Sequence, residues 1–148
     1  MENPLSVHAL RWCDAEQFRD AILTQGNSDS GAAALRVLIV EDEPLLAMML
    51  IDIVEELGHV VAQTCADISG AMAAVSADGF DAAIIDLNLY GERADPVAAR
   101  LAEMNIPFVI ATGAADGADQ LGALAVIPKP YRFEDIDKAL ATLNANLR

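Results

Sequence analysis

Residues 38–57 read LIVEDEPLLAMMLIDIVEEL and join a short apolar run to a helical pattern through an acidic turn. The run at residues 38–40 has the length and the branched side chains of a buried strand. After Pro44, apolar residues recur every four positions, at Leu45, Met49, Ile53 and Leu57. Gly58 follows where a helix is expected to end. The sequence therefore predicts a strand and then a helix over residues 44–57.

The same alternation continues to the C-terminus. Four more strands are expected at residues 60–64, 82–85, 108–111 and 124–127. Helices are expected from a cap at Asp67 to about residue 77, after the Asp95-Pro96 cap, near residues 116–121 and over residues 132–147. Strands and helices that alternate in this way form a parallel sheet with helices on both faces. We therefore expect an α/β fold with a doubly wound sheet.

Residues 1–34 differ from the remainder and predict an N-terminal extension beside a domain at residues 35–148. Asp14 and Gln17 have capping-box spacing for a short helix, and residues 25–31, QGNSDSG, read as a flexible linker. The apolar stripe of this helix would consist of Phe18, Ala21 and Ile22. Two interpretations stay open, a loosely attached arm or an amphipathic helix for docking or dimerisation.

Composition excludes several classes of function. The chain has 148 residues, of which 54% are hydrophobic but only 5% aromatic, so its core must be aliphatic. Its net charge of −14 would repel nucleic-acid phosphate, so we expect no DNA binding. The longest apolar run, residues 45–51, is too short for membrane insertion, and no signal-peptide pattern begins the chain. With Cys13 and Cys65 expected as reduced thiols, these features indicate a cytoplasmic protein.

Polar residues follow four of the expected strands. In chain order they are Glu41 with Asp42, Asp86 with Asn88, Thr112 with Gly113, and Lys129 with Pro130. Functional groups of open parallel sheets gather beyond the carboxyl ends of the strands. We therefore expect these residues to share one site.

The expected site has a definite chemistry. Each close pair of its carboxylates repels by about 1 kcal/mol in water and roughly 4 kcal/mol near a protein surface. Mg²⁺ would relieve this repulsion, because it prefers carboxylate oxygens and retains several waters. Asp86 could then act as a nucleophile towards phosphorus and form an aspartyl phosphate. Lys129 and Thr112 would stabilise charge on the transferred group, and Gly113 would leave room beside it.

These residues resemble the receiver domain of two-component response regulators, the CheY-like family, over residues 36–147. The resemblance implies a flavodoxin-like (βα)5 sheet with strand order 2-1-3-4-5. It also implies a phosphorylation-controlled switch that takes its phosphoryl group from a histidine kinase and is not an enzyme acting on other substrates. Such a switch either changes its binding to a downstream protein or drains phosphate to a phosphotransferase.

The resemblance also assigns roles to single residues. Asp86 is implied as the phosphoacceptor, and Mg²⁺ as bound by Glu41, Asp42, Asp86 and the backbone carbonyl of Asn88. Thr112 is implied as the switch hydroxyl and Lys129 as the ion-pair partner of the phosphoryl group. Gly113 lies beside them, and the bond between Lys129 and Pro130 is implied to be cis.

Residues 107–114 read PFVIATGA, similar to the PFxFATGUY type of receiver from α-proteobacteria. The chain departs from that motif at Ile110 and Ala114. It departs from most receivers at Val126, where an aromatic residue normally couples to the switch threonine. Similar proteins imply a kinase of the HWE or HisKA2 type, often in general stress signalling.

Three alternative functions fit these residues less well. A pseudo-receiver that serves as an unphosphorylated interaction scaffold would lack some key residues, and none is missing. A haloacid-dehalogenase-like phosphatase needs an acid two residues after its nucleophile on the first strand, whereas Asp86 ends the third strand and is followed by Asn88. A flavodoxin-type nucleotide-binding protein would have a Gly/Ser/Thr loop where residues 41–44 read EDEP.

The remaining distinctive side chains are expected to be structural. Met48, Met49 and Met72 lie at helical spacing and are expected in the core. Tyr131 is expected to pack at the base of the last helix, and His59 to lie on the surface.

Overall fold

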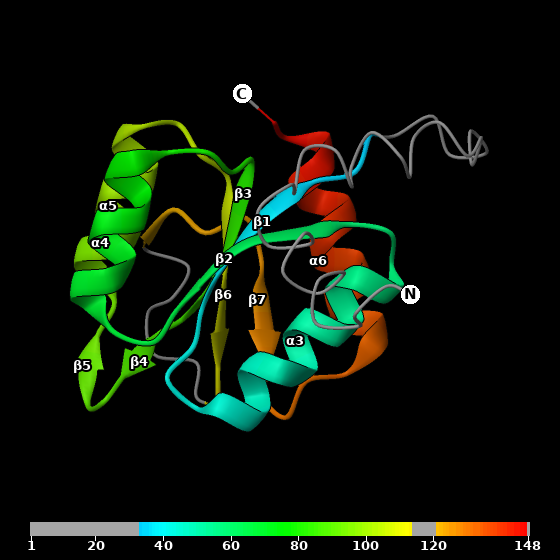
Figure 1. The fold of residues 1–148 in the computed structure, drawn as a ribbon, viewed down its shortest axis with the longest axis horizontal. Helices are drawn as coiled ribbons and strands as arrows, with labels where there is room; N and C mark the ends of the chain where they lie inside the picture. The colour runs from blue at the N-terminus through cyan, green and yellow to red at the C-terminus, as the bar shows by residue number, and fades with distance from the viewer. Residues whose placement is uncertain (1–32, 114–120, 148) are drawn as a thin grey trace, which may run out of the picture. The chain divides into compact units, whose positions relative to one another are not determined.

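The computed structural model describes residues 33–113 and 121–147 (Figure 1). Its strands are β1 (Arg36–Val40), β2 (Val60–Cys65), β3 (Ala82–Asp86), β4 (Asn88–Leu89), β5 (Glu92–Arg93), β6 (Phe108–Thr112) and β7 (Val126–Pro128). Its helices are α3 (Pro44–Glu56), α4 (Ile68–Ala77), α5 (Asp95–Glu103) and α6 (Phe133–Ala145). The short helix predicted in the extension, its linker and most of the helix predicted near residues 116–121 fall outside the described residues.

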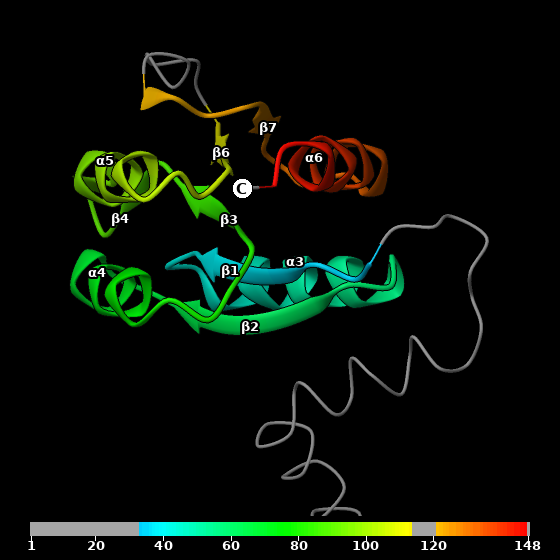
Figure 2. The ribbon, with the colours of Figure 1, turned by 90° about the horizontal axis from the view of Figure 1, so that it is seen from above.

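The main sheet has five strands in the order β2-β1-β3-β6-β7, and each neighbouring pair is parallel. Because β6 and β7 are the fourth and fifth strands of the alternating pattern, this confirms the expected order 2-1-3-4-5 and the flavodoxin-like α/β fold. Figure 2 shows α3 and α6 on one side of the sheet and α4 and α5 on the other.

Two apolar clusters fill the layers on either side of the sheet. Along β1, Leu38 and Val40 join the cluster under α4 and α5, whereas Val37 and Ile39 join the cluster under α3 and α6. Successive strand residues point to opposite faces, so a strand covered on both sides must be apolar throughout. The continuous apolar runs in the sequence therefore predicted the central strands correctly.

The helix starts are close to those predicted. Asp67 caps α4, since its Oδ1 accepts a hydrogen bond from the Gly70 N–H at 2.6 Å. Helix α5 starts one residue earlier than expected, with Ala94 as its N-cap and Asp95 as its first residue. Pro96 then falls in the first turn, where a missing N–H leaves no helical bond unmade.

None of the helices in the described residues combines the length and apolarity needed to cross a bilayer.

The inward face of α3 differs from the prediction. Leu50 and Val54 are buried, while Leu45 is 69% exposed, Met48 60% and Met49 41%. The expectation that Met48 and Met49 lie in the core was therefore wrong. Helix α3 carries apolar residues on most of its surface, so four-residue spacing alone could not identify the stripe that faces the sheet.

A short hairpin between β3 and α5 was not predicted. Strands β4 and β5 pair antiparallel, and the turn residues Tyr90 and Gly91 have φ angles of +50° and +81°. Positive φ at both central residues is what a type I′ hairpin turn requires. Two-residue strands are too short to leave an alternating pattern in the sequence, which explains the omission.

Candidate functional site

The strand ends that carry the predicted polar residues lie side by side at one edge of the sheet. The strand register places them there, because it pairs Val40 with Ile85, Asp86 with Ala111, and Thr112 with Pro128. Glu41 follows Val40 and Lys129 follows Pro128, so both come just past the ends of paired strands. Strand order reverses between β1 and β3, which is where ligands bind in open α/β sheets.

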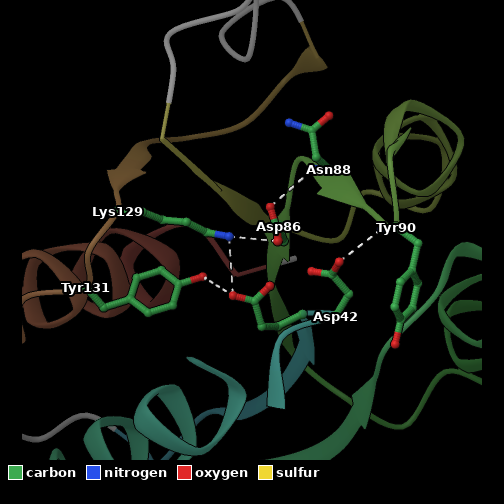
Figure 3. A network of polar contacts seen from close by, with 7 residues as sticks. Asp42, Asp86, Asn88, Tyr90, Lys129 and Tyr131 are labelled. Atoms are coloured by element: carbon green, nitrogen blue, oxygen red, sulfur yellow. Dashed lines mark hydrogen bonds and ion pairs between the residues drawn. The ribbon is translucent and has the colours of Figure 1, made fainter. Parts of the chain in front are cut away.

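Three carboxylates meet at this edge (Figure 3). Oxygen atoms of Glu41, Asp42 and Asp86 all lie within 4.8 Å of one another. The Glu41 side chain is fully buried, and Asp86 is also buried, whereas Asp42 lies half-buried at the rim. The cluster is therefore partly shielded from water, and its mutual repulsion is poorly screened.

Lys129 is the cation that pairs with two of the three carboxylates. Its Nζ lies 2.7 Å from Asp86 Oδ2 and 3.3 Å from Glu41 Oε1. One ammonium cannot balance three carboxylates, so the pocket keeps an excess of negative charge. The charge distribution therefore leaves room for a further cation.

Tyr131 contacts the cluster beside Lys129 (Figure 3). Its hydroxyl donates a buried hydrogen bond of 3.0 Å to Glu41 Oε1. Within residues 33–113 and 121–147, Glu41 Oε2 is buried and has no hydrogen-bond partner. One oxygen of Glu41 is thus held by the protein, while the other is left for a donor or cation from outside the chain.

Backbone N–H groups of the β4–β5 hairpin hold the other two carboxylates. Asn88 donates to Asp86 Oδ1 at 3.1 Å, and Tyr90 donates to Asp42 Oδ2 at 3.0 Å. Figure 3 shows the side chains of Asn88 and Tyr90 pointing away from the carboxylates, so both act here through the main chain. The hairpin therefore fixes two of the three acids.

The electrostatics of the pocket follow from these contacts. Burial, followed by the interaction with Asp86, raises the pKa of Glu41 to about 8. Partial burial favours a higher pKa for Asp42, but hydrogen bonds with the Tyr90 N–H and with the Asp86 carboxyl group outweigh it and lower the pKa. Burial opposes the charged form of Lys129, yet the bond to Asp86 and the attraction of both acids raise its pKa. A retained proton on Glu41 would offset one of the two negative charges that Lys129 does not balance.

The donor set fits a hard divalent cation. It offers carboxylate oxygens at close range, one of them buried and without a partner, and it carries uncompensated negative charge. Mg²⁺ suits such a set because it binds one or two carboxylates and completes its octahedron with water. The Asn88 carbonyl, predicted as a further ligand, belongs to the residue whose N–H binds Asp86.

The other predicted residues lie at the ends of β6 and β7. Thr112 is buried at the end of β6, and its carbonyl accepts a hydrogen bond from the Lys129 N–H at 3.2 Å. Gly113 is exposed, and an added Cβ there would contact no described atom within 4 Å. The peptide bond between Lys129 and Pro130 is cis.

Two contributors to the pocket were not predicted from the sequence. Tyr131 was expected only to pack at the base of α6, yet it is buried against Glu41. The one feature of the sequence that could have indicated this role is its position directly after Lys129-Pro130, which keeps the residue close to the strand-end site. The Tyr90 N–H leaves no signal, because any residue but proline supplies the same donor.

Comparison with known proteins identifies relatives of this chain. The family model of the response regulator receiver domain matches residues 37–141. The transcriptional regulatory protein TcrA of Mycobacterium tuberculosis is 30% identical over 126 residues, covering 80% of this chain and 49% of TcrA. The two-component response regulator PhoP of Pseudomonas aeruginosa is 34% identical over 121 residues, covering 77% and 52%. The chain thus spans about half the length of each relative.

A solved structure resembles the chain more closely in sequence. The solution structure of SdrG from Sphingomonas melonis Fr1 is 45% identical and has a TM-score of 0.66. The match covers 74% of this chain and 96% of that one.

Proposed function

Because this chain belongs to the response regulator receiver domain family, we propose that Asp86 is the residue that accepts the phosphoryl group. The domain is a phosphoacceptor switch of a two-component system, and its donor is a histidine kinase. The observation that carries the assignment is the position of Asp86, a buried carboxylate at the end of β3 with Lys129 2.7 Å from one oxygen. Glu41 and Asp42 lie around it in the acidic cluster.

We assign Mg²⁺ to Glu41, Asp42, Asp86 and the Asn88 carbonyl. When bound, the ion neutralises the carboxylates and the oxygens of the incoming group. The fit rests on the close carboxylate oxygens and on the unpartnered Glu41 Oε2.

The chain's own residues perform the transfer. A carboxylate oxygen of Asp86 forms a bond to phosphorus as the P–N bond of the donor phosphohistidine breaks. Lys129 moves with the developing charge from the Asp86 carboxylate to the phosphoryl oxygens, and the Thr112 hydroxyl donates a further hydrogen bond. Gly113 offers no side chain that would obstruct them.

Labelling tests this assignment directly. Purified protein is incubated with Mg²⁺ and radiolabelled acetyl phosphate, and separately with a phosphorylated histidine kinase. Wild type is expected to become labelled and Asp86→Asn to remain unlabelled. The matched control is Asp137→Asn, which makes the same change at an exposed position on α6 and should leave labelling intact. Equal labelling of Asp86→Asn and wild type would refute the assignment, and no labelling of either by any donor would favour a scaffold role.

The finer identity of the protein is also a proposal. We place it among the PFxFATGUY-type receivers, which is supported by the sequence of residues 107–114. The partner kinase is then of the HWE or HisKA2 type, and the protein works in the cytoplasm. Phosphotransfer from a panel of kinases of several types tests this, because the cognate pair should be fastest by at least tenfold.

The kinase needs a contact surface beside Asp86. Leu45, Met48 and Met49 are exposed in the first turns of α3, which begins two residues after Asp42. Exposed apolar side chains grouped beside a reaction site are typical of protein contact surfaces. We therefore assign this part of α3 as the contact surface for the kinase.

The division of the chain is a separate proposal. Residues 35–148 form the receiver unit, and residues 1–34 form an extension.

A further inference from the structure

We propose that Tyr131 is a positioning residue for the phosphoryl-transfer site. Its hydroxyl fixes the Glu41 carboxylate, so that Glu41 Oε2 is presented to the metal and Lys129 is kept on Asp86. This inference rests on the proposed function, because it assigns Tyr131 a task within the same site.

The contact is built into the core. The Tyr131 side chain is buried, and its hydroxyl reaches Glu41 Oε1 across a 3.0 Å buried hydrogen bond. Residues 41 and 131 lie far apart in the chain and meet only through the fold. A hydrogen bond from a hydroxyl to a carboxylate oxygen is directional, so it restricts how the carboxylate rotates.

The two Glu41 oxygens have different surroundings. Oε1 accepts from Tyr131 and lies 3.3 Å from Lys129 Nζ, whereas the buried Oε2 has no partner in the described part of the chain. A fully buried carboxylate oxygen without a partner is unfavourable unless something outside the chain satisfies it. Tyr131 therefore selects which oxygen is left for the metal ion or for a water bound to it.

The same hydroxyl governs where Lys129 lies. Lys129 Nζ is closer to Asp86 Oδ2, at 2.7 Å, than to Glu41 Oε1, at 3.3 Å. Because Tyr131 already donates a hydrogen bond to Oε1, Glu41 attracts the Lys129 ammonium less strongly than an unbonded carboxylate would. Without the hydroxyl, Lys129 would be the only described donor to a buried carboxylate, and Nζ would shift from Asp86 towards Glu41. The face of the Tyr131 ring, whose centroid lies 5.9 Å from Nζ, adds a weak attraction for the ammonium.

Tyr131→Phe isolates the hydroxyl, because it keeps the buried ring and removes one oxygen. Mg²⁺ affinity is measured by calorimetry and by the amide shifts of Asn88 and Gly113 during titration. We expect Mg²⁺ to bind about tenfold or more weakly to Tyr131→Phe, the usual effect of removing a group that orients a metal ligand. Thr142→Val is the matched control, because it removes a hydroxyl that donates to the Lys138 carbonyl within α6. This control should bind Mg²⁺ as wild type does.

A kinetic readout separates positioning from a purely structural role. With acetyl phosphate, Tyr131→Phe should need about tenfold more Mg²⁺ for half-maximal labelling, while its rate at saturating Mg²⁺ stays within about threefold of wild type. A merely structural residue would lower thermal stability and leave the half-saturating Mg²⁺ concentration unchanged.

A double-mutant cycle links the effect to Glu41. Glu41→Gln alone should weaken Mg²⁺ binding, and adding Tyr131→Phe to it should cause no further loss. If wild type binds Mg²⁺ and Tyr131→Phe binds it equally well, the inference fails while the proposed function stands. If the loss persists unchanged in the Glu41→Gln background, the inference also fails. If wild type binds no Mg²⁺, the proposed metal site itself fails.

Discussion

Lys129 Nζ and Asp86 Oδ2 form a 2.7 Å ion pair, so the proposed phosphoacceptor is already paired with the residue proposed to bind its phosphoryl group. The same ammonium also lies 3.3 Å from Glu41 Oε1. In the absence of metal, Lys129 is therefore the main positive charge that holds the acidic cluster together. Metal and phosphoryl group must both compete with or displace this pair.

Replacing Lys129 should have opposite effects on stability and on metal binding. In Mg²⁺-free buffer, Lys129→Met should lower the free energy of unfolding by roughly 2 kcal/mol, because it leaves buried carboxylates unpaired. This loss of unfolding free energy is smaller than for a fully buried pair, because the Lys129 side chain is 21% exposed. Removing a competing positive charge should also tighten Mg²⁺ binding, by about tenfold. Urea denaturation and calorimetry measure the two effects, and weaker Mg²⁺ binding by the variant would contradict the interpretation.

Stability in the absence of metal should fall as the pH rises. The pKa of Glu41 is about 8 in the folded chain, against 4.5 as its ordinary value. Between these values the folded state binds more protons than the unfolded state, so the free energy of unfolding decreases from about pH 4.5 to about pH 8. Urea denaturation by circular dichroism at several pH values in EDTA should show this decline.

Glu41→Gln is the control for the pH dependence, because it carries no titrating group at this position. Its unfolding free energy should decline less over the same range. Added Mg²⁺ should stabilise wild type more at pH 8.5 than at pH 6, since the ion binds the deprotonated carboxylate. An identical pH profile for wild type and Glu41→Gln would show that Glu41 does not titrate as described.

The hairpin turn should accept a better turn residue. Tyr90 has φ of +50° and is 68% exposed, so its side chain gains little from burial while its backbone is in the left-handed region. Tyr90→Asn should stabilise the domain by up to about 1 kcal/mol, because asparagine favours this conformation and keeps the N–H bonded to Asp42. Gly91→Ala, at φ of +81°, should destabilise it by about 1 kcal/mol. Urea titration compares the two variants, and a destabilised Tyr90→Asn would indicate that the Tyr90 ring makes a contact worth more than the strain.

A charge in the exposed apolar part of α3 should slow phosphotransfer from the kinase and leave labelling by acetyl phosphate nearly unchanged. Leu45→Lys should slow phosphotransfer from the cognate kinase by tenfold or more, because it places a charge in an apolar contact. Labelling by acetyl phosphate should stay within twofold of wild type, since that donor needs no protein surface. Leu147→Lys, at another exposed leucine beyond the end of α6, is the matched control. Equal slowing by both variants would indicate a general effect of charge and not a contact at α3.

The sequence predicted the sheet well because its strands have few alternatives. Residues 82–85 are apolar and buried, and a run of that length between turn signals fits a strand covered on both faces. Helix α3 shows the limit of such patterns. Apolar residues occupy so much of its surface that the sheet, and not the spacing, decides that Leu50 and Val54 face inward and Leu45 outward.

The acidic residues of the site were predictable because their chemistry lies in side chains at strand ends. Parallel topology alone brings Glu41, Asp42 and Asp86 to one edge. The contacts that orient these acids were not predictable. The Tyr131 hydroxyl reaches Glu41 only through the packing of α6 and its preceding segment, and the Tyr90 N–H depends on a positive φ that tyrosine rarely adopts.

The bond from the Tyr131 hydroxyl to Glu41 limits how this domain can be recombined with its relatives. The backbone bond from the Lys129 N–H to the Thr112 carbonyl would survive such an exchange, because any residue but proline supplies the donor. A chimaera that took its first strand from a receiver without this glutamate would leave the Tyr131 hydroxyl without its acceptor. The segment that carries Tyr131 must therefore be exchanged together with a first strand that is followed by glutamate.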